Sequence, residues 1–374
     1  MKAATGRPGM PAAAALSGEQ TAEVSLTRPL VSAVLLCCNR ADYVIEALQS
    51  ALGQDCPAMQ LIVSDDASTD GTAERVAAEV AAYAGPHQVE FCRQPDNSGS
   101  KSAHLNRVFP RARGEVIVSF DDDDISRPDR VSRILAAFSA NPGAQAVYSA
   151  FSSIDARGQP RGRGSVPHPP PGIPASRWFA RVDAYAAGTT LAVRRRVVEL
   201  FGDLDPDINE DIVLPFRASL LGEVVYLDEE LVRARRHGTS LTSDLDIFRS
   251  IERYRARFLD GIERARRHST RRLADLKTAG ELMPERQAEW RALEHVVAAS
   301  LADAEAAAGL VSPSLPARLS ALLQQWRRGA YPEDRGRNLA LALIPGIYLR
   351  HKRRSLQLRN RHTRARGHRN SDTR

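Results

Sequence analysis

The stretch Glu115-Val116-Ile117-Val118-Ser119-Phe120 runs directly into Asp121-Asp122-Asp123-Asp124. Its β-branched and aromatic residues predict a buried strand. Four adjacent carboxylates repel one another unless a cation or a basic ligand lies beside them. A solvated acidic turn is the alternative, but such a turn seldom follows a strand this apolar. Because Mg²⁺ usually takes one or two carboxylates together with substrate phosphates, the run predicts a metal and diphosphate site.

Strands and helices alternate on the N-terminal side of this run. The apolar segment Leu30 to Cys38 predicts a first strand, and the spacing of Val44, Leu48 and Leu52 predicts a helix over 41–52. Further strands are predicted at 60–63 and 89–92, with helices near 72–83 and 102–109. This alternation predicts an α/β fold with a mostly parallel sheet and helices on both faces. Such sheets bind ligands at the carboxyl ends of their strands.

Two further acidic clusters stand at the ends of predicted elements. Asp65 and Asp66 follow the second strand, where they either cap the next helix or accept from a base N–H or ribose hydroxyls. Taken alone, capping is favoured, because the residues from Ser68 to Gly71 are ordinary capping and turn residues. Glu210 and Asp211 also suit a helix start.

The motifs together resemble the family 2 inverting glycosyltransferases of the GT-A fold, from about Leu30 to Ser240. The resemblance rests on five segments in order: Val31 to Arg40, Ser50 to Gln54, Ser64 to Thr72, Asn97-Ser98-Gly99 with Asn106, and Ala112 to Glu115. In the third segment, Ala67 replaces the family's usual glycine. The resemblance implies a GT-A (Rossmann-like) sheet flanked by helices, and an enzyme that moves a sugar from a nucleotide sugar to a hydroxyl acceptor with inversion.

The resemblance also implies roles for individual residues. Nucleotide-sugar binding is assigned to Asn39, Arg40, Asp65, Asp66, Asp121 and Asp122. A divalent Mg²⁺ or Mn²⁺ is assigned to Asp123 with Asp121, although a register shifted to Asp122 and Asp124 stays open. Asp211 becomes the candidate general base. The acceptor or the diphosphate is assigned to Gly188, Thr189, Glu210, Arg236 and His237.

The partners follow from the same resemblance. The donor is expected to be a nucleotide sugar, most commonly a UDP-sugar, with GDP and dTDP open. The acceptor is expected to be a carbohydrate or a lipid-linked molecule, in the synthesis of a surface polysaccharide or glycoconjugate. Arg233 and Arg235, beside Arg236 and His237, suit either diphosphate binding or a solvated basic surface.

The chain is expected to divide into four parts. These are a disordered N-terminal segment (1–28), a GT-A glycosyltransferase domain (29–240), a helical extension (241–326) and a basic tail (327–374). A proline- and glycine-rich stretch from Arg157 to Pro174 is predicted to be a loop. Long helical periodicity is predicted over 247–273 and 285–308.

The basic tail holds 14 Lys and Arg against three acidic residues, so its local balance of +11 exceeds the net charge of +7 of the whole chain. Its apolar segment 339–349 is followed by Arg350-His351-Lys352-Arg353-Arg354. That combination suits peripheral contact with an anionic membrane. Packing on the catalytic domain is an equal alternative. No specific nucleic-acid binding is expected, because the tail lacks base-stacking aromatics.

Cysteine usage and hydropathy bear on location. Cys37, Cys38, Cys56 and Cys92 show no C-x-x-C spacing, which favours a reducing cytoplasm. No apolar run approaches the ~18 residues of a membrane span. The expected location is therefore cytoplasmic, with any membrane contact at the inner face of the cell membrane.

Two other functions compete with the glycosyltransferase interpretation. A nucleotidyltransferase also needs aspartates and Mg²⁺, but it usually carries a Gly-rich loop after its first strand, which Cys38 to Asp42 lacks. A noncatalytic binding protein acting through its basic tail is the second alternative, and the intact carboxylate series argues against it.

Overall fold

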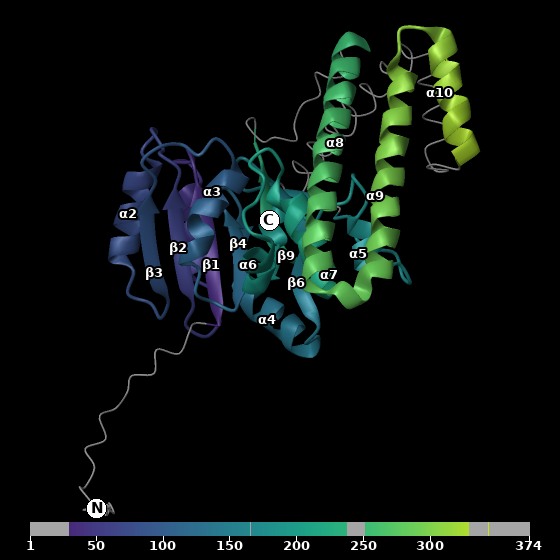
Figure 1. Ribbon diagram of the computed structural model, residues 1–374. Helices are drawn as coiled ribbons and strands as arrows, with labels where there is room; N and C mark the ends of the chain where they lie inside the picture. Colours follow the sequence, from purple (N-terminus) through teal and green to yellow (C-terminus); the bar gives the residue numbers. More distant parts are fainter. Residues whose placement is uncertain (1–29, 165, 238–250, 329–342, 344–374) are drawn as a thin grey trace, which may run out of the picture.

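The computed structural model describes residues 30–164, 166–237, 251–328 and 343. Within them, nine strands form one sheet in the order β3-β2-β1-β4-β8-β6-β9-β5, with β7 paired to β6 (Figure 1). The expectations for residues 1–28 and for most of 327–374 lie outside the described residues. The strands are β1 (Val31–Cys37), β2 (Gln60–Asp65), β3 (Gln88–Arg93), β4 (Val116–Asp121), β5 (Ile125–Ser126), β6 (Ala144–Asp155), β7 (Pro160–Arg163), β8 (Ala192–Arg194) and β9 (Glu223–Arg236).

The predicted parallel core of the sheet is confirmed. β1 lies between β2 and β4 and pairs in parallel with both, and β2 pairs in parallel with β3. All seven residues of β1 are buried, which explains why its sequence is apolar except for Ser32. Gly114, just before β4, packs so closely on β1 that a Cβ atom there would lie 2.3 Å from the Ser32 amide nitrogen. This contact explains the glycine of the Ala112 to Glu115 motif.

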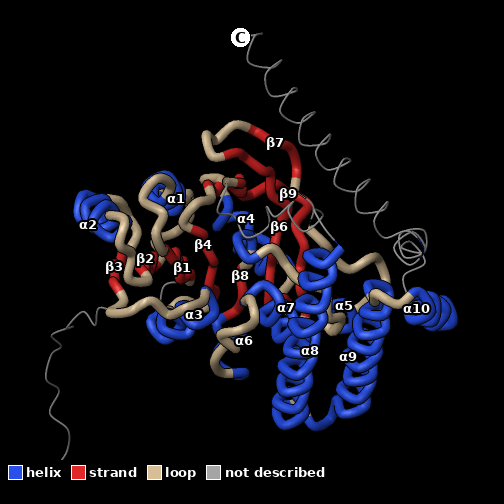
Figure 2. The backbone as a smooth tube through the Cα atoms, turned by 90° about the horizontal axis from the view of Figure 1, so that it is seen from above, coloured by secondary structure: helices blue, strands red, loops and turns tan. Residues whose placement is uncertain are grey.

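Helices cover both faces of the sheet, as Figure 2 shows. One face carries α1 (Val44–Leu52), α2 (Thr72–Ala82) and α4 (Arg130–Ala140), whose buried residues share a core with β1, β2 and β4. The other face carries α3 (Lys101–Val108), α6 (Arg195–Phe201) and α7 (Glu210–Leu221). A short α5 (Ala175–Phe179) packs beside α7. The α/β class predicted from the alternating pattern is confirmed.

One predicted loop contains a strand, and several other strands were not predicted. The stretch Arg157 to Pro174 is not entirely a loop, because β7 lies inside it and forms an antiparallel hairpin with β6. The strands β6, β8 and β9 were not predicted. β8 lies antiparallel between β4 and β6, whereas β9 pairs in parallel with β6. Pairings between segments this distant in sequence leave no local periodic signal.

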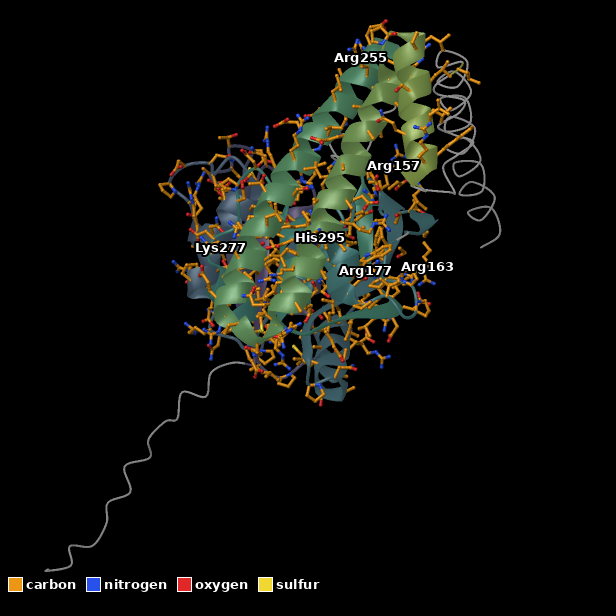
Figure 3. The ribbon with its side chains drawn as sticks, turned by 45° about the vertical axis from the view of Figure 1, so that its right-hand side comes forward. Arg157, Arg163, Arg177, Arg255, Lys277 and His295 are labelled. Atoms are coloured by element: carbon orange, nitrogen blue, oxygen red, sulfur yellow. The ribbon has the colours of Figure 1, made fainter. Side chains whose placement is uncertain are left out.

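The helical extension consists of α8 (Ile251–Leu282), α9 (Gln287–Ala308) and α10 (Leu315–Arg328). Figure 3 shows α8 and α9 side by side, with Lys277 and Arg255 on α8 and His295 on α9. The extension is not a separate layer, because Leu276, Trp290 and Val297 belong to the same apolar core as Phe216 of α7. Among the described residues, no helix is both long and apolar enough to cross a membrane.

Candidate active site

The carboxyl ends of β1, β2 and β4 meet at one edge of the sheet. Cys37 of β1 lies opposite Asp65 of β2, and Leu36 lies opposite Asp121 of β4. The Asn39-Arg40 turn and the two predicted acidic clusters therefore come together, as expected for the ligand edge of a parallel sheet. The N-terminus of α7 adds Glu210 and Asp211 through the contacts described below.

The Asp65-Asp66 carboxylates bind the loops around them. Asp65 is fully buried, and its Oδ2 accepts from the Ser68 amide at 3.0 Å. Asp66 accepts from the Ser98 amide at 2.9 Å and from the Ser98 hydroxyl at 2.8 Å. The Arg93 Nε atom lies 3.6 Å from Asp65. The carboxylates of Asp65 and Asp66 thus stabilise the loops around them. Any contact with a nucleoside is additional to this structural role.

Two residues beside these carboxylates have left-handed backbone angles. Asn39 has φ +52° and Ala67 has φ +58°. Asn tolerates this region, and the Asn39 Oδ1 atom accepts from the Thr69 amide at 2.9 Å. Ala67 stands where the resemblance expects glycine, and a Cβ atom in this conformation costs roughly 1–2 kcal/mol. The glycine of the motif therefore serves the backbone turn.

Each of the four consecutive aspartates has its own hydrogen-bond partner. Asp122 Oδ2 accepts from the Cys38 amide at 2.9 Å, and its Oδ1 lies 3.8 Å from Arg40 Nε. Asp124 accepts from the Arg235 amide at 2.7 Å. Asp121 and Asp123 instead meet side chains, as described below. The backbone contacts of Asp122 and Asp124 favour Asp121 and Asp123 as the pair that faces a ligand.

Crowding of negative charge raises two pKa values in this run. Burial, followed by the charge of Asp123, raises the pKa of Asp122 to about 8. Burial, followed by the charge of Asp121, raises the pKa of Asp124 to about 7, and the buried Thr189 hydroxyl partly offsets this. The aspartates therefore form a site in which an added positive charge is favourable.

His237 at the end of β9 lies against the aspartate run. Its Nε2 atom is 2.8 Å from Asp123 Oδ2, and its ring stacks on Tyr43 with centroids 5.1 Å apart. Asp123 also lies 3.9 Å from Arg40 Nε. An imidazole nitrogen and a carboxylate oxygen this close suit a shared divalent ion as well as a hydrogen bond. Within the described residues, no three His, Cys, Asp or Glu side chains converge as a metal site.

The arginines before His237 point in different directions. Arg235 is buried; its Nε donates to the Asp123 carbonyl at 2.9 Å, and its side chain pairs with Glu46. Arg236 is exposed, with its guanidinium 5.9 Å from the centre of the Phe151 ring. Arg233 is also exposed. Arg235 thus supports the aspartate run from behind, and its burial excludes it from the solvated basic surface that was one of its two expected roles.

Lys101, which the sequence analysis missed, joins the aspartate run to α7. Its Nζ lies 2.6 Å from Asp121 Oδ1 and 2.7 Å from Glu210 Oε1. These two carboxylates raise the pKa of Lys101 well above its usual value despite burial. A lysine at the first position of a helix opposes the helix dipole. This unfavourable placement of a positive charge was the sequence feature that could have marked Lys101 as a functional residue.

Asp211 lies in the first turn of α7 beside the Lys101 bridge. Its Oδ1 is buried and accepts no hydrogen bond from the described residues. Burial, followed by the charge of Glu210, raises its pKa to about 8. Burial, followed by the charge of Asp211, raises the pKa of Tyr185. An unpaired carboxylate oxygen with this pKa is suited to accept a proton near neutral pH.

Gly188 allows this arrangement by its small size. It opens the 3-10 turn Gly188–Thr190, and a Cβ atom there would lie 2.5 Å from Glu210 Oε1. The Ala186 amide donates to the Asp211 carbonyl at 2.9 Å, so the same segment holds the start of α7. The predicted residues Gly188, Thr189, Glu210 and Asp211 are therefore brought together with the aspartate run.

A comparison with protein families matches residues 32–201 to the model described as "Glycosyl transferase family 2". The matched segment contains β1 to β4 and the aspartate run, but it ends before α7. Asp211, Arg236 and His237 thus lie beyond it.

Curated relatives align over part of the chain. Chondroitin synthase of Escherichia coli is 34% identical over 130 residues, which cover 35% of this chain and 18% of that protein. The succinoglycan biosynthesis protein ExoO of Rhizobium meliloti (strain 1021) is 34% identical over 131 residues, covering 35% and 36%. The putative glycosyltransferase EpsE of Bacillus subtilis (strain 168) is 33% identical over 150 residues, covering 39% and 52%. The chain therefore aligns with about half or less of the length of these relatives.

Solved structures align with the chain at low identity and with TM-scores below 0.5. TarS 1–349 of S. aureus in complex with UDP-GlcNAc superposes with a TM-score of 0.49 and 18% identity, covering 81% of this chain and 93% of that one. The mannosyltransferase PcManGT of Pyrobaculum calidifontis, in complex with GDP-Man and Mn²⁺, has a TM-score of 0.44 and 19% identity, covering 86% and 88%.

Proposed function

We propose that the chain, whose residues 32–201 match glycosyl transferase family 2, moves a sugar from a nucleotide-sugar donor to a hydroxyl acceptor with inversion. The observation that carries the proposal is the Lys101 bridge. It brings Asp121, at the ligand edge of the sheet, within one side chain of Glu210 at the start of α7. The proposed donor site and the candidate base thereby lie beside one another.

Asp211 is the proposed general base. An acceptor hydroxyl is a poor nucleophile at neutral pH, so a base that takes its proton during attack accelerates transfer. The buried, unpaired Oδ1 of Asp211 is suited to that hydrogen bond. Attack on the anomeric carbon from the face opposite the diphosphate is a single displacement, which inverts the configuration.

The diphosphate is proposed to lie near Lys101, Arg40 and His237. Lys101 pairs with Asp121 and Arg40 with Asp122, so both positive side chains lie at the aspartate run. The residues fit a divalent ion, because Asp123 and His237 offer donor atoms 2.8 Å apart among carboxylates that like charge destabilises. Asp123, together with Asp121 or His237 and the donor phosphates, would hold Mg²⁺ or Mn²⁺. When bound, the ion supplies charge neutralisation for the departing diphosphate.

The nucleoside is proposed to lie along the end of β1. Asn39 and Arg40 form the turn there, and Asp65 and Asp66 lie behind it. UDP is the first candidate, with GDP and dTDP as alternatives. The name of the succinoglycan relative supports a polysaccharide or glycoconjugate product, with a carbohydrate or lipid-linked acceptor.

The first experiment separates donor binding from transfer. A thermal-shift panel with UDP, GDP, dTDP and CMP and their sugar conjugates, each with and without Mn²⁺, should show a metal-dependent stabilisation by one nucleotide. Asp211→Asn should retain that shift and lose transfer. Asp123→Ala should lose the metal-dependent part of the shift.

The half-buried Asp205→Asn change is the matched control, because this carboxylate near α7 has no contact with the site residues named above, and an asparagine oxygen can still accept from the Asp207 amide. It should leave both shift and transfer unchanged. Equal loss of nucleotide binding in the Asp211 and Asp123 variants would contradict the division of roles. Release of pyrophosphate from a nucleoside triphosphate and a sugar phosphate would instead identify a nucleotidyltransferase.

A further inference from the structure

The last described helix exposes a continuous apolar stripe. Leu315, Leu319, Leu323 and Trp326 follow one another at intervals of four, four and three residues, which places them on one face of α10. Their exposures are 45%, 37%, 52% and 44%. We call these four residues the α10 stripe. Scattered exposed leucines are normal, but an aligned set on one helix indicates a partner.

The adjacent face of α10 already has a partner. Ala321 and Leu322 are almost fully buried against Leu310 and Val311, and this cluster extends to Phe258 of α8. The helix is therefore held in place by one face while the stripe points away. Figures 1 and 2 both show α10 at the outer edge of the molecule, on the far side of α9 from the sheet.

The charge of this region selects among the occupants that could cover the stripe. α10 contains three arginines and no acidic residue, and the sequence from 327 to 374 has a balance of +11. A second copy of α10 would bring like charges together. The apolar segment 339–349 is followed by five consecutive basic residues, so its docking there would also add positive charge. An anionic surface with an apolar interior satisfies both the leucines and the arginines.

We propose that α10 docks on an anionic lipid bilayer, inserting the α10 stripe between the lipid headgroups. Trp326 suits the boundary of headgroups and acyl chains, since its ring is apolar and its N–H is polar. Arg327 follows it directly and would meet the anionic headgroups. This surface is independent of the proposed transferase site and is tested without any donor or acceptor.

The test uses the full chain and vesicle co-sedimentation. Vesicles of equal parts phosphatidylcholine and phosphatidylglycerol should bind the protein, whereas pure phosphatidylcholine vesicles should bind it much more weakly. The double change Leu319→Ser with Leu323→Ser should lower the partition coefficient on anionic vesicles by about tenfold or more. Both positions are exposed, so circular dichroism should show an unchanged fold.

The matched control changes two equally exposed leucines on α8. Leu273→Ser with Leu282→Ser alters side chains that are each 42% exposed and lie outside the apolar cluster that holds α10, and should leave the partition coefficient unchanged. Because both double variants keep the whole basic tail, a difference between them isolates the stripe. Equal binding of the two variants would overturn the proposal, as would failure of the unaltered chain to bind anionic vesicles.

Tryptophan fluorescence gives a second readout. The chain has three tryptophans, and Trp290 is only 2% exposed, whereas Trp326 is 44% exposed. Anionic vesicles should shift the emission to the blue, and Trp326→Phe should remove most of that shift. A dimer of the unaltered chain that the Leu319/Leu323 change converts to a monomer, with vesicle binding unaltered, would assign the stripe to a second copy instead.

Discussion

The surroundings of Asp211 disfavour the charged form of its carboxylate. Burial and the neighbouring Glu210 raise its pKa to about 8, while Lys101 beside Glu210 lowers it only in part. Replacing such a buried acid could stabilise the protein. An ionisable acid that is present in such a position is a candidate for function rather than for folding. The proposed base therefore makes a direct prediction about pH.

The rate should follow ionisation of Asp211. The carboxylate can accept a proton only when it is deprotonated, so kcat/KM should rise with pH and level off above about 8. Well below that pH, each unit should cost roughly tenfold in kcat/KM. The measurement is a pH profile of transfer with the donor identified by the thermal-shift panel. A profile that is flat between acidic and alkaline pH would exclude Asp211 as the rate-determining base.

At the scale of elements, α8 holds the segment that leads to the acceptor side of the site. Arg272 of α8 is buried; its Nε donates to the Phe179 carbonyl at 2.8 Å and its Nη2 to the Ala184 carbonyl at 3.3 Å. Tyr185, whose pKa is raised by burial and by the charge of Asp211, follows Ala184 directly. A helix outside the family match is thus connected to the candidate base through one short segment.

Arg272→Met should therefore destabilise the fold and disturb the site. Two buried carbonyls lose their donor, which predicts a loss of roughly 2–4 kcal/mol in the free energy of unfolding. The kcat of transfer should also fall, because Tyr185 and its segment lose their support. Urea unfolding and steady-state kinetics measure the two effects, and Arg272→Lys should partly restore both.

The control for Arg272 is Arg267 on the same helix. Arg267 pairs with Asp207 at 3.6 Å, and both side chains are about half exposed or more, so Arg267→Met should change stability by less than ~1 kcal/mol. Equal effects of the two changes would mean that α8 is anchored by its apolar face alone.

At the scale of the whole molecule, the catalytic sheet and the extension share one core. Arg217 of α7 and Asp275 of α8 are both buried and lie 3.3 Å apart, and Trp290 of α9 packs into the same apolar cluster as Phe216. The sequence placed a domain boundary at residue 240, where the composition changes. The packing shows that a change in composition there does not separate two cores.

A chain ending at residue 240 should therefore fail to fold cooperatively. Truncation would expose Phe216 and leave Arg217 without its buried partner. A chain ending at Arg328 keeps this core, so its thermal midpoint should match that of the full chain. Thermal unfolding followed by circular dichroism compares the two. A cooperative transition in the chain that ends at residue 240 would show that α8 and α9 are dispensable for folding.

Much of the fold was predictable from local sequence patterns. Buried apolar runs identified β1, β2 and β4, and the strand predicted at 89–92 formed as β3 although none of its residues is buried. These strands alternate with helices at a spacing typical of a mostly parallel sheet. The acidic clusters stand at strand ends, so their convergence followed from the sheet type. Some motif positions proved to be structural, since Gly114 serves close packing and Ala67 occupies a left-handed turn.

Other features depend on contacts between distant segments. The pairing of Asp123 with His237, the Lys101 bridge to Glu210 and the burial of Arg235 join residues that lie about 110 or more apart, or on different helices. Hydrophobic periodicity says which side of an element is buried, but not which neighbour buries it. Because β9 joins the sheet beside β6 and α8 packs on α7, the order of elements in space decides which charges meet. That order is a property of the packed chain and not of any local stretch.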